Sequence, residues 1–277
     1  MPELPEVEVV RRGLIPLLQG RRIIALADSG KSLRYIAPLN LLRGTLRDAV
    51  ITEIGRRAKY LLFSTHRDDL LILHLGMTGK LGIFPTSTAP AKHDHLIFTL
   101  DNGMDLRFND ARRFGAVHII SSTQRAQGEK KFFQEAGPEP LGKKCTSTYL
   151  HKRAAGSRQA IKTFIMNGKI LAGVGNIYAN ESLFAAGIHP GTPACSLTGE
   201  QWRVLLKKIR QTLRKAIECG GSTISDFLNA GGESGYFQMN FKVYGRQGEA
   251  CPSCPGQIVR ETINGRAAFF CPICQQK

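Results

Sequence analysis

Apolar side chains recur at helical spacing near the start of the chain. They return every three or four residues, at Leu4, Val7, Val10, Leu14 and Leu17. Gly20 follows this stretch, and glycine adopts the left-handed conformation that ends many helices. The pattern predicts a first helix that ends before Gly20 and buries one face.

From residue 22 to residue 120 the pattern changes to short β-rich runs. Gly, Asp and Pro residues separate these runs, as turns do between strands. The clearest runs are 59–64, 70–75, 96–100 and 116–120. Many short strands with frequent turns are typical of a β-sandwich or barrel.

The segment 137–142 contains two prolines and two glycines and indicates a linker. After it the hydrophobic spacing becomes helical, and we expect helices near 158–166, 176–186 and 199–219. A cysteine-rich module follows.

These patterns predict an α+β protein with two main domains. The N-terminal domain, over residues 1–136, is expected to be a β-sandwich with flanking helices. A helical domain is expected over residues 137–240, and a metal-binding β-hairpin over residues 241–277.

The chain is strongly basic. Lys and Arg total 38 against 22 acidic residues, which gives a formal net charge of +16 at pH 7. A polyanionic partner such as nucleic acid is the simplest explanation, but net charge does not determine fold, and an unspecialised basic protein is the alternative.

The sequence contains no signal for a membrane. No apolar run approaches the ~20 residues that span a bilayer. The first six residues are acidic where a signal peptide is basic. We expect a soluble, cytoplasmic protein, and in that reducing compartment the lone cysteines are expected to serve core packing. These are Cys145, Cys195 and Cys219.

Four further cysteines form two tight pairs near the C-terminus: Cys251, Cys254, Cys271 and Cys274. The 16 residues between the two C-x2-C pairs match the spacing of a four-thiolate zinc site. Asn264-Gly265 lies between the pairs and suits a two-residue hairpin turn. We expect one zinc ion per chain, and because four sulfurs leave no open position, its role is expected to be structural.

The expected hairpin also carries Arg260 and Arg266, which give it a means of reaching phosphate. A hairpin that only stabilises the C-terminal part of the chain is the alternative.

Pro2 becomes the terminal residue once Met1 is removed, and it then carries a secondary amine. An α-amino group has a pKa of about 7.7 to 8.0, so it is partly neutral near pH 7 and can attack an electrophilic carbon. Pro2 and Pro5 also suit the first turn of a helix, so this feature alone does not establish chemistry.

The start of the chain, MPELPEVE over residues 1–8, closely resembles the start of bacterial formamidopyrimidine-DNA glycosylases. Matching motifs continue in order along essentially the whole chain. They are RRAKYL over 56–61, HLGMTG over 74–79, KHDH over 92–95, RRFG over 112–115, GVGNIY over 173–178, and the four cysteines.

The resemblance implies an N-terminal β-sandwich followed by a helical domain with a helix-two-turn-helix element and a zinc finger. It implies excision of oxidised purines from damaged double-stranded DNA, followed by β- and δ-elimination at the abasic site. The protein is then expected to be a monomer associated with the bacterial nucleoid.

The resemblance also implies the catalytic roles. Pro2 is the nucleophile at C1′, and Glu3 is the acid/base group beside it. Glu6 supports their position, although acidic residues also favour a helix N-terminus for electrostatic reasons alone. Lys59 assists catalysis and elimination, and Arg266 assists δ-elimination.

The DNA contacts implied by the resemblance fall into two sets. Met77, Arg112 and Phe114 match the side chains that fill the gap left by an everted base. The other contacts are expected from His93, Arg158, Lys162 and Asn176.

Ser157 and Ala111 depart from residues common in relatives, which affects the expected contact around Arg158. The glycine-rich segment 230–237 resembles a loop that closes over the everted base, but a plain surface loop is its alternative.

Two other functions fit parts of this pattern. A glycosylase of the endonuclease VIII type shares the proline nucleophile but prefers oxidised pyrimidines, and Leu4 together with the Met77, Arg112 and Phe114 set argues against it. A non-catalytic zinc-ribbon protein could bind nucleic acid by charge alone, but it leaves Pro2, Glu3 and Lys59 unexplained.

Overall fold

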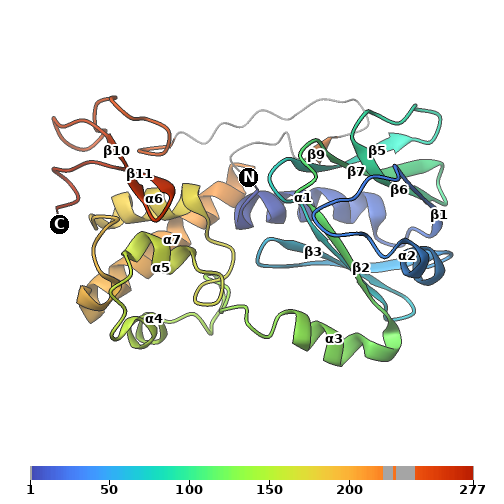
Figure 1. Cartoon of the computed structure of the whole chain (residues 1–277), viewed down its shortest axis with the longest axis horizontal. Helices are drawn as coiled ribbons and strands as arrows, with labels where there is room; N and C mark the ends of the chain where they lie inside the picture. Colours follow the sequence, from blue (N-terminus) through green and yellow to red (C-terminus); the bar gives the residue numbers. More distant parts are fainter. Residues whose placement is uncertain (1, 221–226, 229–240, 277) are drawn as a thin grey trace. The chain divides into compact units, whose positions relative to one another are not determined.

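The computed structural model describes residues 2–220, 227–228 and 241–276. The chain forms two compact units (Figure 1). Unit 1 contains residues 1–134 and 219–238, and unit 2 contains residues 135–218 and 239–277. The helical and cysteine-rich segments therefore share one unit, and the three-part division drawn from the sequence stays a prediction.

Unit 1 begins with helix α1 (Leu4–Leu18), as the apolar spacing predicts. One expected position is wrong, because Leu17 is 39% exposed whereas Leu18 is fully buried. At 100° per residue, Leu18 falls in the middle of the helix face that Leu4, Val7 and Leu14 bury, whereas Leu17 falls at the edge of that face.

The strands of unit 1 form two sheets. One sheet has the order β1 (Ile23–Asp28), β6 (Asp94–Leu100), β7 (Met104–Asp110), β5 (Gly79–Pro85) and β9 (Phe227–Leu228), with only the β5–β9 pair parallel. The other has the antiparallel order β2 (Ile51–Arg57), β3 (Tyr60–Thr65), β4 (Leu70–His74) and β8 (Ala116–Ile120). Short helices α2 (Leu39–Leu46) and α3 (Arg125–Phe132), which the sequence analysis did not predict, accompany the sheets.

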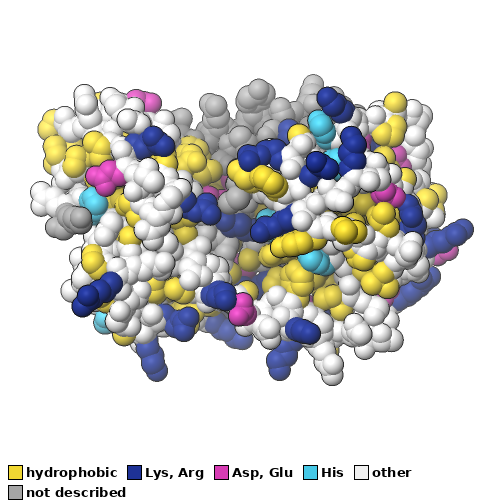
Figure 2. Space-filling view, viewed as in Figure 1, with side chains coloured by type: hydrophobic (Ala, Val, Ile, Leu, Met, Phe, Trp, Pro, Cys, Tyr) yellow, Lys and Arg dark blue, Asp and Glu magenta, His cyan; other side chains and the backbone are white. Residues whose placement is uncertain are grey.

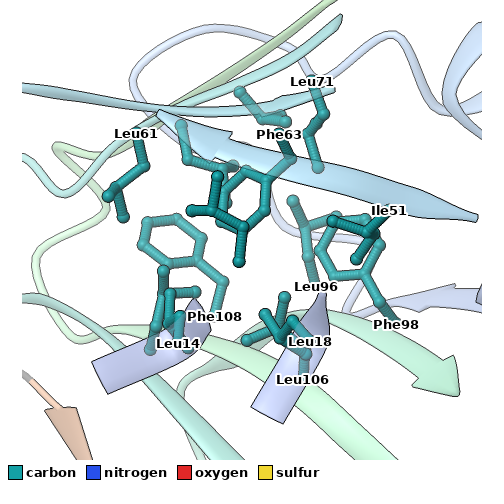
Figure 3. Close-up of a cluster of buried hydrophobic side chains, with 14 of the residues drawn as sticks. Leu14, Leu18, Ile51, Leu61, Phe63, Leu71, Leu96, Phe98, Leu106 and Phe108 are labelled. Carbon is teal, nitrogen blue, oxygen red and sulfur yellow. The ribbon is translucent and has the colours of Figure 1, made fainter. Parts of the chain in front are cut away.

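A single apolar core joins the two sheets and α1. Phe63 from one sheet, Phe98 and Phe108 from the other, and Leu14 from α1 lie in the same buried cluster (Figure 3). Burial of each such side chain contributes roughly 1.5–3 kcal/mol. The expected β-sandwich with flanking helices is confirmed.

Unit 2 contains helices α4 (Ser147–Ala154), α5 (Ile161–Met166), α6 (Asn176–Ala186) and α7 (Gly199–Glu218). They pack around Phe164, Tyr178 and Trp202. Helix α5 begins three residues later than residue 158, because Ala160 is extended and forms a β-bridge with Pro193. Helix α4 was not predicted.

The cysteine-rich segment of unit 2 contains the hairpin of β10 (Val259–Ile263) and β11 (Arg266–Phe270). Asn264 and Gly265 both have positive φ, at 48° and 73°, so the predicted two-residue turn is confirmed. Helix α6 holds the preceding segment, because the buried Glu181 carboxylate accepts three backbone N–H groups at 2.9 Å, from Lys242, Val243 and Tyr244.

Candidate active site and metal centre

The N-terminus of α1 brings Pro2, Glu3 and Glu6 together in the interior of unit 1. Pro2 is buried, and both carboxylic side chains are almost fully buried. Glu3 is the N-cap, and its amide donates a hydrogen bond of 2.8 Å to Glu6 Oε2, one half of a reciprocal capping box. The helix start thus fixes the Glu3 backbone directly after Pro2, and a buried carboxylate lies beside the residue expected to be the nucleophile.

Lys59 lies half-buried in the tight turn that joins β2 to β3. Its neighbour Ala58 has a left-handed backbone with φ 55°, which a residue other than glycine adopts at a cost. The Ala58 carbonyl accepts a hydrogen bond of 2.9 Å from Arg56 Nη1, and Arg56 Nε donates to Glu8 at 3.1 Å. Glu8 on α1 therefore connects the helix that carries Glu3 to the turn that carries Lys59.

The sequence analysis missed Glu8 and Arg56 as members of this site. Burial raises the pKa of the Glu8 carboxyl, but hydrogen bonds from Arg11 and Arg12, together with that of Arg56, outweigh it and bring the pKa to about 2. Glu8 is therefore ionised at neutral pH. The arginine-binding carboxylate could be suspected from its position four residues before Arg12, but nothing local indicates Arg56.

His74, at the end of β4, lies close to the turn that carries Lys59. Its Nδ1 accepts the Gly76 N–H at 3.0 Å, and its ring lies 4.8 Å from the Tyr60 ring. Burial, assisted by the positive charge of Lys59, lowers the pKa of His74 to about 4. The neutral imidazole thus shapes the start of the loop that carries Met77.

Met77, Arg112 and Phe114 converge on one part of unit 1. Met77 and Phe114 are 39% and 43% exposed, and the Arg112 guanidinium carbon lies 4.8 Å from the Phe114 ring centroid. They border a cavity of about 700 Å³ that Arg34 and His74 also line. Met77 and Phe114 are thus exposed apolar side chains beside a cavity, and the Arg112 cation lies over the Phe114 ring. Such side chains are suited to insertion into a base stack.

Close backbone packing holds the loops that carry these side chains. Gly76 has φ 66°, and a Cβ at this position would lie 2.4 Å from the carbonyl carbon of Phe114. The buried Asp110 carboxylate accepts the Thr78 hydroxyl at 2.5 Å and the Gly115 N–H at 2.7 Å. The two loops therefore act as one preformed structure.

His93 lies half-buried just before β6, and its carbonyl accepts the Asp110 N–H at 3.0 Å. The following histidine, His95, is buried and bonds the Asp110 carbonyl through Nε2. Of the two histidines in this motif, His93 is therefore the one available to a ligand.

In unit 2, Arg266 is exposed at the start of β11, directly after the hairpin turn, and Arg158 is exposed before α5. The side chain of Lys162, which is expected to contact DNA, is only 1% exposed, and its Nζ donates to the Ala267 carbonyl at 2.5 Å. Burial, together with the charge of Arg266, lowers the pKa of Lys162 to about 8. Lys162 thus supports the hairpin that presents Arg266.

Asn176 begins α6 after the N-cap Gly175, so the N-terminal end of this helix offers backbone amides as the GVGNIY motif predicts. Its side-chain amide donates to the Ala267 carbonyl at 3.1 Å. Asn176 and Lys162 therefore bind the same carbonyl of β11. The glycine-rich segment 230–237 lies outside the described residues.

The four paired cysteines form one cluster in unit 2. Their sulfur atoms all lie within 4.8 Å of one another, and the sulfurs of Cys254 and Cys271 are 3.4 Å apart, those of Cys251 and Cys274 3.8 Å apart. A tetrahedral zinc–thiolate site with bonds of about 2.3 Å places its sulfurs about 3.8 Å apart. Backbone amides of Ser253 and Gly256 also point at two of the sulfurs, which favours thiolates. The cluster can hold a metal ion.

The molecular surface agrees with the basic composition. Figure 2 shows Lys and Arg side chains over the displayed face, where acidic side chains are few. Within the described residues, no helix has the length and apolar composition that crossing a bilayer requires.

The fold and the site define a two-unit protein with a β-sandwich, a helical unit and a cluster of four cysteines that can hold a metal ion. Residues 1–117 match the family model "Formamidopyrimidine-DNA glycosylase N-terminal domain", and residues 136–228 match "Formamidopyrimidine-DNA glycosylase H2TH domain". The chain belongs to the formamidopyrimidine-DNA glycosylase family.

Individual relatives extend this result to the full length. The formamidopyrimidine-DNA glycosylases of Laribacter hongkongensis and Edwardsiella ictaluri are 46% and 44% identical, over 100% of this chain and 100% of theirs. A crystal structure of Lactococcus lactis Fpg with DNA containing an abasic site matches with a TM-score of 0.90 and 35% identity, over 100% of both chains. The same protein with N7-benzyl-Fapy-dG DNA gives the same values.

Proposed function

We propose that this protein removes oxidised purines, namely 8-oxoguanine and formamidopyrimidines, from duplex DNA and then cleaves the strand at the resulting abasic site. The observation that carries the proposal is the start of α1, where a buried Pro2 directly precedes a buried N-cap carboxylate in a chain related to these glycosylases over its full length. The similarity to enzyme structures bound to abasic-site and Fapy-dG DNA supports the substrate class.

The reaction begins at the Pro2 nitrogen once Met1 has been removed. Its lone pair forms a bond to C1′ of the damaged nucleotide, and the base leaves with the electrons of the N-glycosidic bond. Glu3 supplies and accepts protons at the sugar, because its carboxylate adjoins the nucleophile. Glu6 takes the Glu3 N–H and so fixes the Glu3 backbone.

The adduct becomes an iminium when the Pro2 nitrogen has lost its proton and the C1′–O4′ bond breaks, with O4′ taking a proton from the Glu3 carboxyl group. Strand cleavage follows from this iminium. The positive nitrogen acidifies the C2′ protons, and loss of one of them expels the 3′ phosphate, after which a second elimination releases the 5′ phosphate. Lys59 assists these eliminations through its ammonium charge, and Arg266 stabilises the departing phosphate with its guanidinium.

DNA binding uses the exposed groups described above. Met77 and Phe114 fill the space of the everted base, and Arg112 bonds the base left unpaired. His93, Arg158 and the N-terminal end of α6 at Asn176 contact phosphates. Lys162 adds positive charge to this DNA-binding region, and its bond to the Ala267 carbonyl also supports the hairpin.

The metal is zinc, one ion per chain, bound by the four clustered cysteines. Sulfur fills all four positions, so the ion stabilises the hairpin and takes no part in the chemistry. We further propose that the protein acts as a cytoplasmic monomer on nucleoid DNA.

Borohydride trapping tests the nucleophile. Reduction should lock the protein covalently onto an 8-oxoguanine duplex, and peptide mapping should find the adduct on Pro2. A tag fused directly to Pro2 removes the amine lone pair and should abolish trapping, whereas the same tag at the C-terminal end is the matched control. Attachment at Lys59, or full activity with the N-terminus blocked, would sink the proline mechanism.

Glu3→Gln tests the acid/base group. Base release should fall by about 100-fold or more, while cleavage of a preformed abasic site should fall less. Glu53→Gln, on an exposed position of β2, is the control and should keep both activities. Equal losses of both activities in Glu3→Gln would assign Glu3 to helix capping instead.

A further inference from the structure

Unit 2 carries a basic groove that the proposed function does not use. The groove is a cavity of about 700 Å³ between the 141–147 segment and one face of α7. None of the described residues that line it is acidic. Its cationic side chains are Lys143, Arg203, Lys207, Arg210 and Arg214.

The charges on α7 form a stripe. Residues 203, 207, 210 and 214 are spaced by four, three and four positions, so they lie along one helix face. Arg203 is paired with Glu200, but Lys207 and Arg214 make no ion pair with any residue in the described part of the chain. Like charges at this spacing repel each other, and an anion bound in the groove relieves that repulsion.

The wall opposite α7 is preformed. The Arg210 guanidinium donates to the carbonyls of Pro140, Gly142 and Cys145 at 2.8, 3.2 and 2.7 Å. These bonds fix the segment that carries Lys143. Helix α4 begins at this wall, where the amides of its first turn add a partial positive charge.

Two leucines also line the groove: Leu206 on α7, which is 4% exposed, and Leu141 on the opposite wall, which is half-buried. We call these two side chains the leucine floor. An occupant that matches both the leucine floor and the basic stripe carries negative charge together with an apolar side chain.

We propose that this groove binds an acidic peptide segment of a partner protein, with an apolar side chain on the leucine floor and carboxylates on the basic stripe. A sugar–phosphate backbone matches the charges but brings no apolar side chain to the floor. Helix α4 also lies at the opposite end of unit 2 from the β10–β11 hairpin (Figure 1), which carries Arg266 and is one of the DNA-binding parts of unit 2 in the proposed function.

The experiment measures fluorescence anisotropy of a labelled peptide made of aspartate and glutamate with one central phenylalanine. The test variant is Lys207→Glu/Arg214→Glu, and the matched control is Lys208→Glu/Lys215→Glu, which makes the same charge change on other faces of α7. The test variant should weaken peptide binding about tenfold or more, and the control less than about twofold. A peptide with Asn and Gln in place of the acids should bind weakly.

Two results would overturn the proposal. The first is equal loss in the two double variants, or no peptide binding by the unmodified protein, because either shows only general attraction to a basic protein. The second is a loss of undamaged-duplex affinity in Lys207→Glu/Arg214→Glu well beyond the control, because the groove is then a DNA site. Excision of 8-oxoguanine should remain equal in both variants, so a failure here leaves the proposed glycosylase activity standing.

Discussion

The loops that carry Met77, Arg112 and Phe114 in unit 1 and the β10–β11 hairpin in unit 2 both present exposed side chains, but they are stabilised differently. The loops of unit 1 rest on a large core and are fixed by glycine packing and the Asp110 carboxylate. The cysteine-rich segment that carries the hairpin has a small core cluster, whose buried members among the described residues are Val243, Cys251, Ile258 and Cys271, so two of them belong to the cysteine cluster. A segment with so small an apolar cluster is stabilised by a cross-link, and a metal ion bound to the four cysteines would supply one.

The largest expected effect follows from breaking that cross-link. Cys254→Ser should release the metal and unfold the hairpin, because structural zinc contributes about 10 kcal/mol or more to such modules. Metal analysis should show loss of the ion, and duplex affinity should fall at least about tenfold. Thermal unfolding of unit 1 should stay unchanged.

Cys195→Ser is the matched control, since Cys195 is exposed and lies outside the cluster. It should keep full metal content and duplex affinity. If the Cys254→Ser protein also kept full metal content and duplex affinity, the four-cysteine metal site would not be what stabilises the hairpin.

The next effect tests the packing that holds the loops of unit 1. Gly76→Ala places a methyl group against the backbone of Phe114 at a left-handed φ, and should cost about 3 kcal/mol or more of unfolding free energy. Gly103→Ala is the control, because Gly103 also has positive φ, 75°, but nothing lies near its added methyl group. It should cost only about 1–2 kcal/mol. Equal costs in urea unfolding would show that conformation alone, and not close packing, requires Gly76.

The contrast between hairpin and loops also shows what the sequence could predict. The turn at Asn264-Gly265 and the cysteine cluster were predicted because both signals are local. The sandwich was predicted from runs of strand-forming residues, whereas α2, α3 and α4 have eight residues each and escaped detection. Convergence of Met77 with Arg112 and Phe114 came only from the family resemblance, because the two loops are distant in sequence.

Buried charges were the least predictable feature. Lys162 was expected to contact DNA, but its burial could not be predicted, because its partner, the Ala267 carbonyl, is 105 residues away in the sequence. Glu8 bonds Arg56 from 48 residues away. A charged residue looks solvent-exposed in sequence unless its distant partners are known, so both roles required the three-dimensional structure.

The Glu8 ion pairs give unit 1 a pH dependence that can be measured. Because the folded pKa of about 2 lies below the ordinary 4.5, the Glu8 contribution is fully present above pH 4.5 and is lost as the pH falls toward 2. That contribution amounts to about 2–3 kcal/mol. Unfolding free energies of the unmodified protein and Glu8→Gln should differ by this amount near pH 6 and converge near pH 2. A constant difference across this range would mean that Glu8 contributes through packing and not through its charge.

The smallest effect on stability is expected for Met77 and Phe114, the exposed side chains that the loops of unit 1 present for DNA binding. Met77→Ala and Phe114→Ala alter exposed side chains, so each should change the unfolding free energy by less than about 0.5 kcal/mol. Excision of 8-oxoguanine from duplex DNA should nevertheless fall by about tenfold or more, because an intact base must be extruded and its place filled. Cleavage at a preformed abasic site should fall much less, since no base remains to be extruded.

Ile36→Ala, at an 85% exposed apolar residue elsewhere in unit 1, should leave both activities unchanged. Equal losses on the two substrates would assign Met77 and Phe114 to general DNA binding and would remove the functional reason for the rigid packing around Gly76.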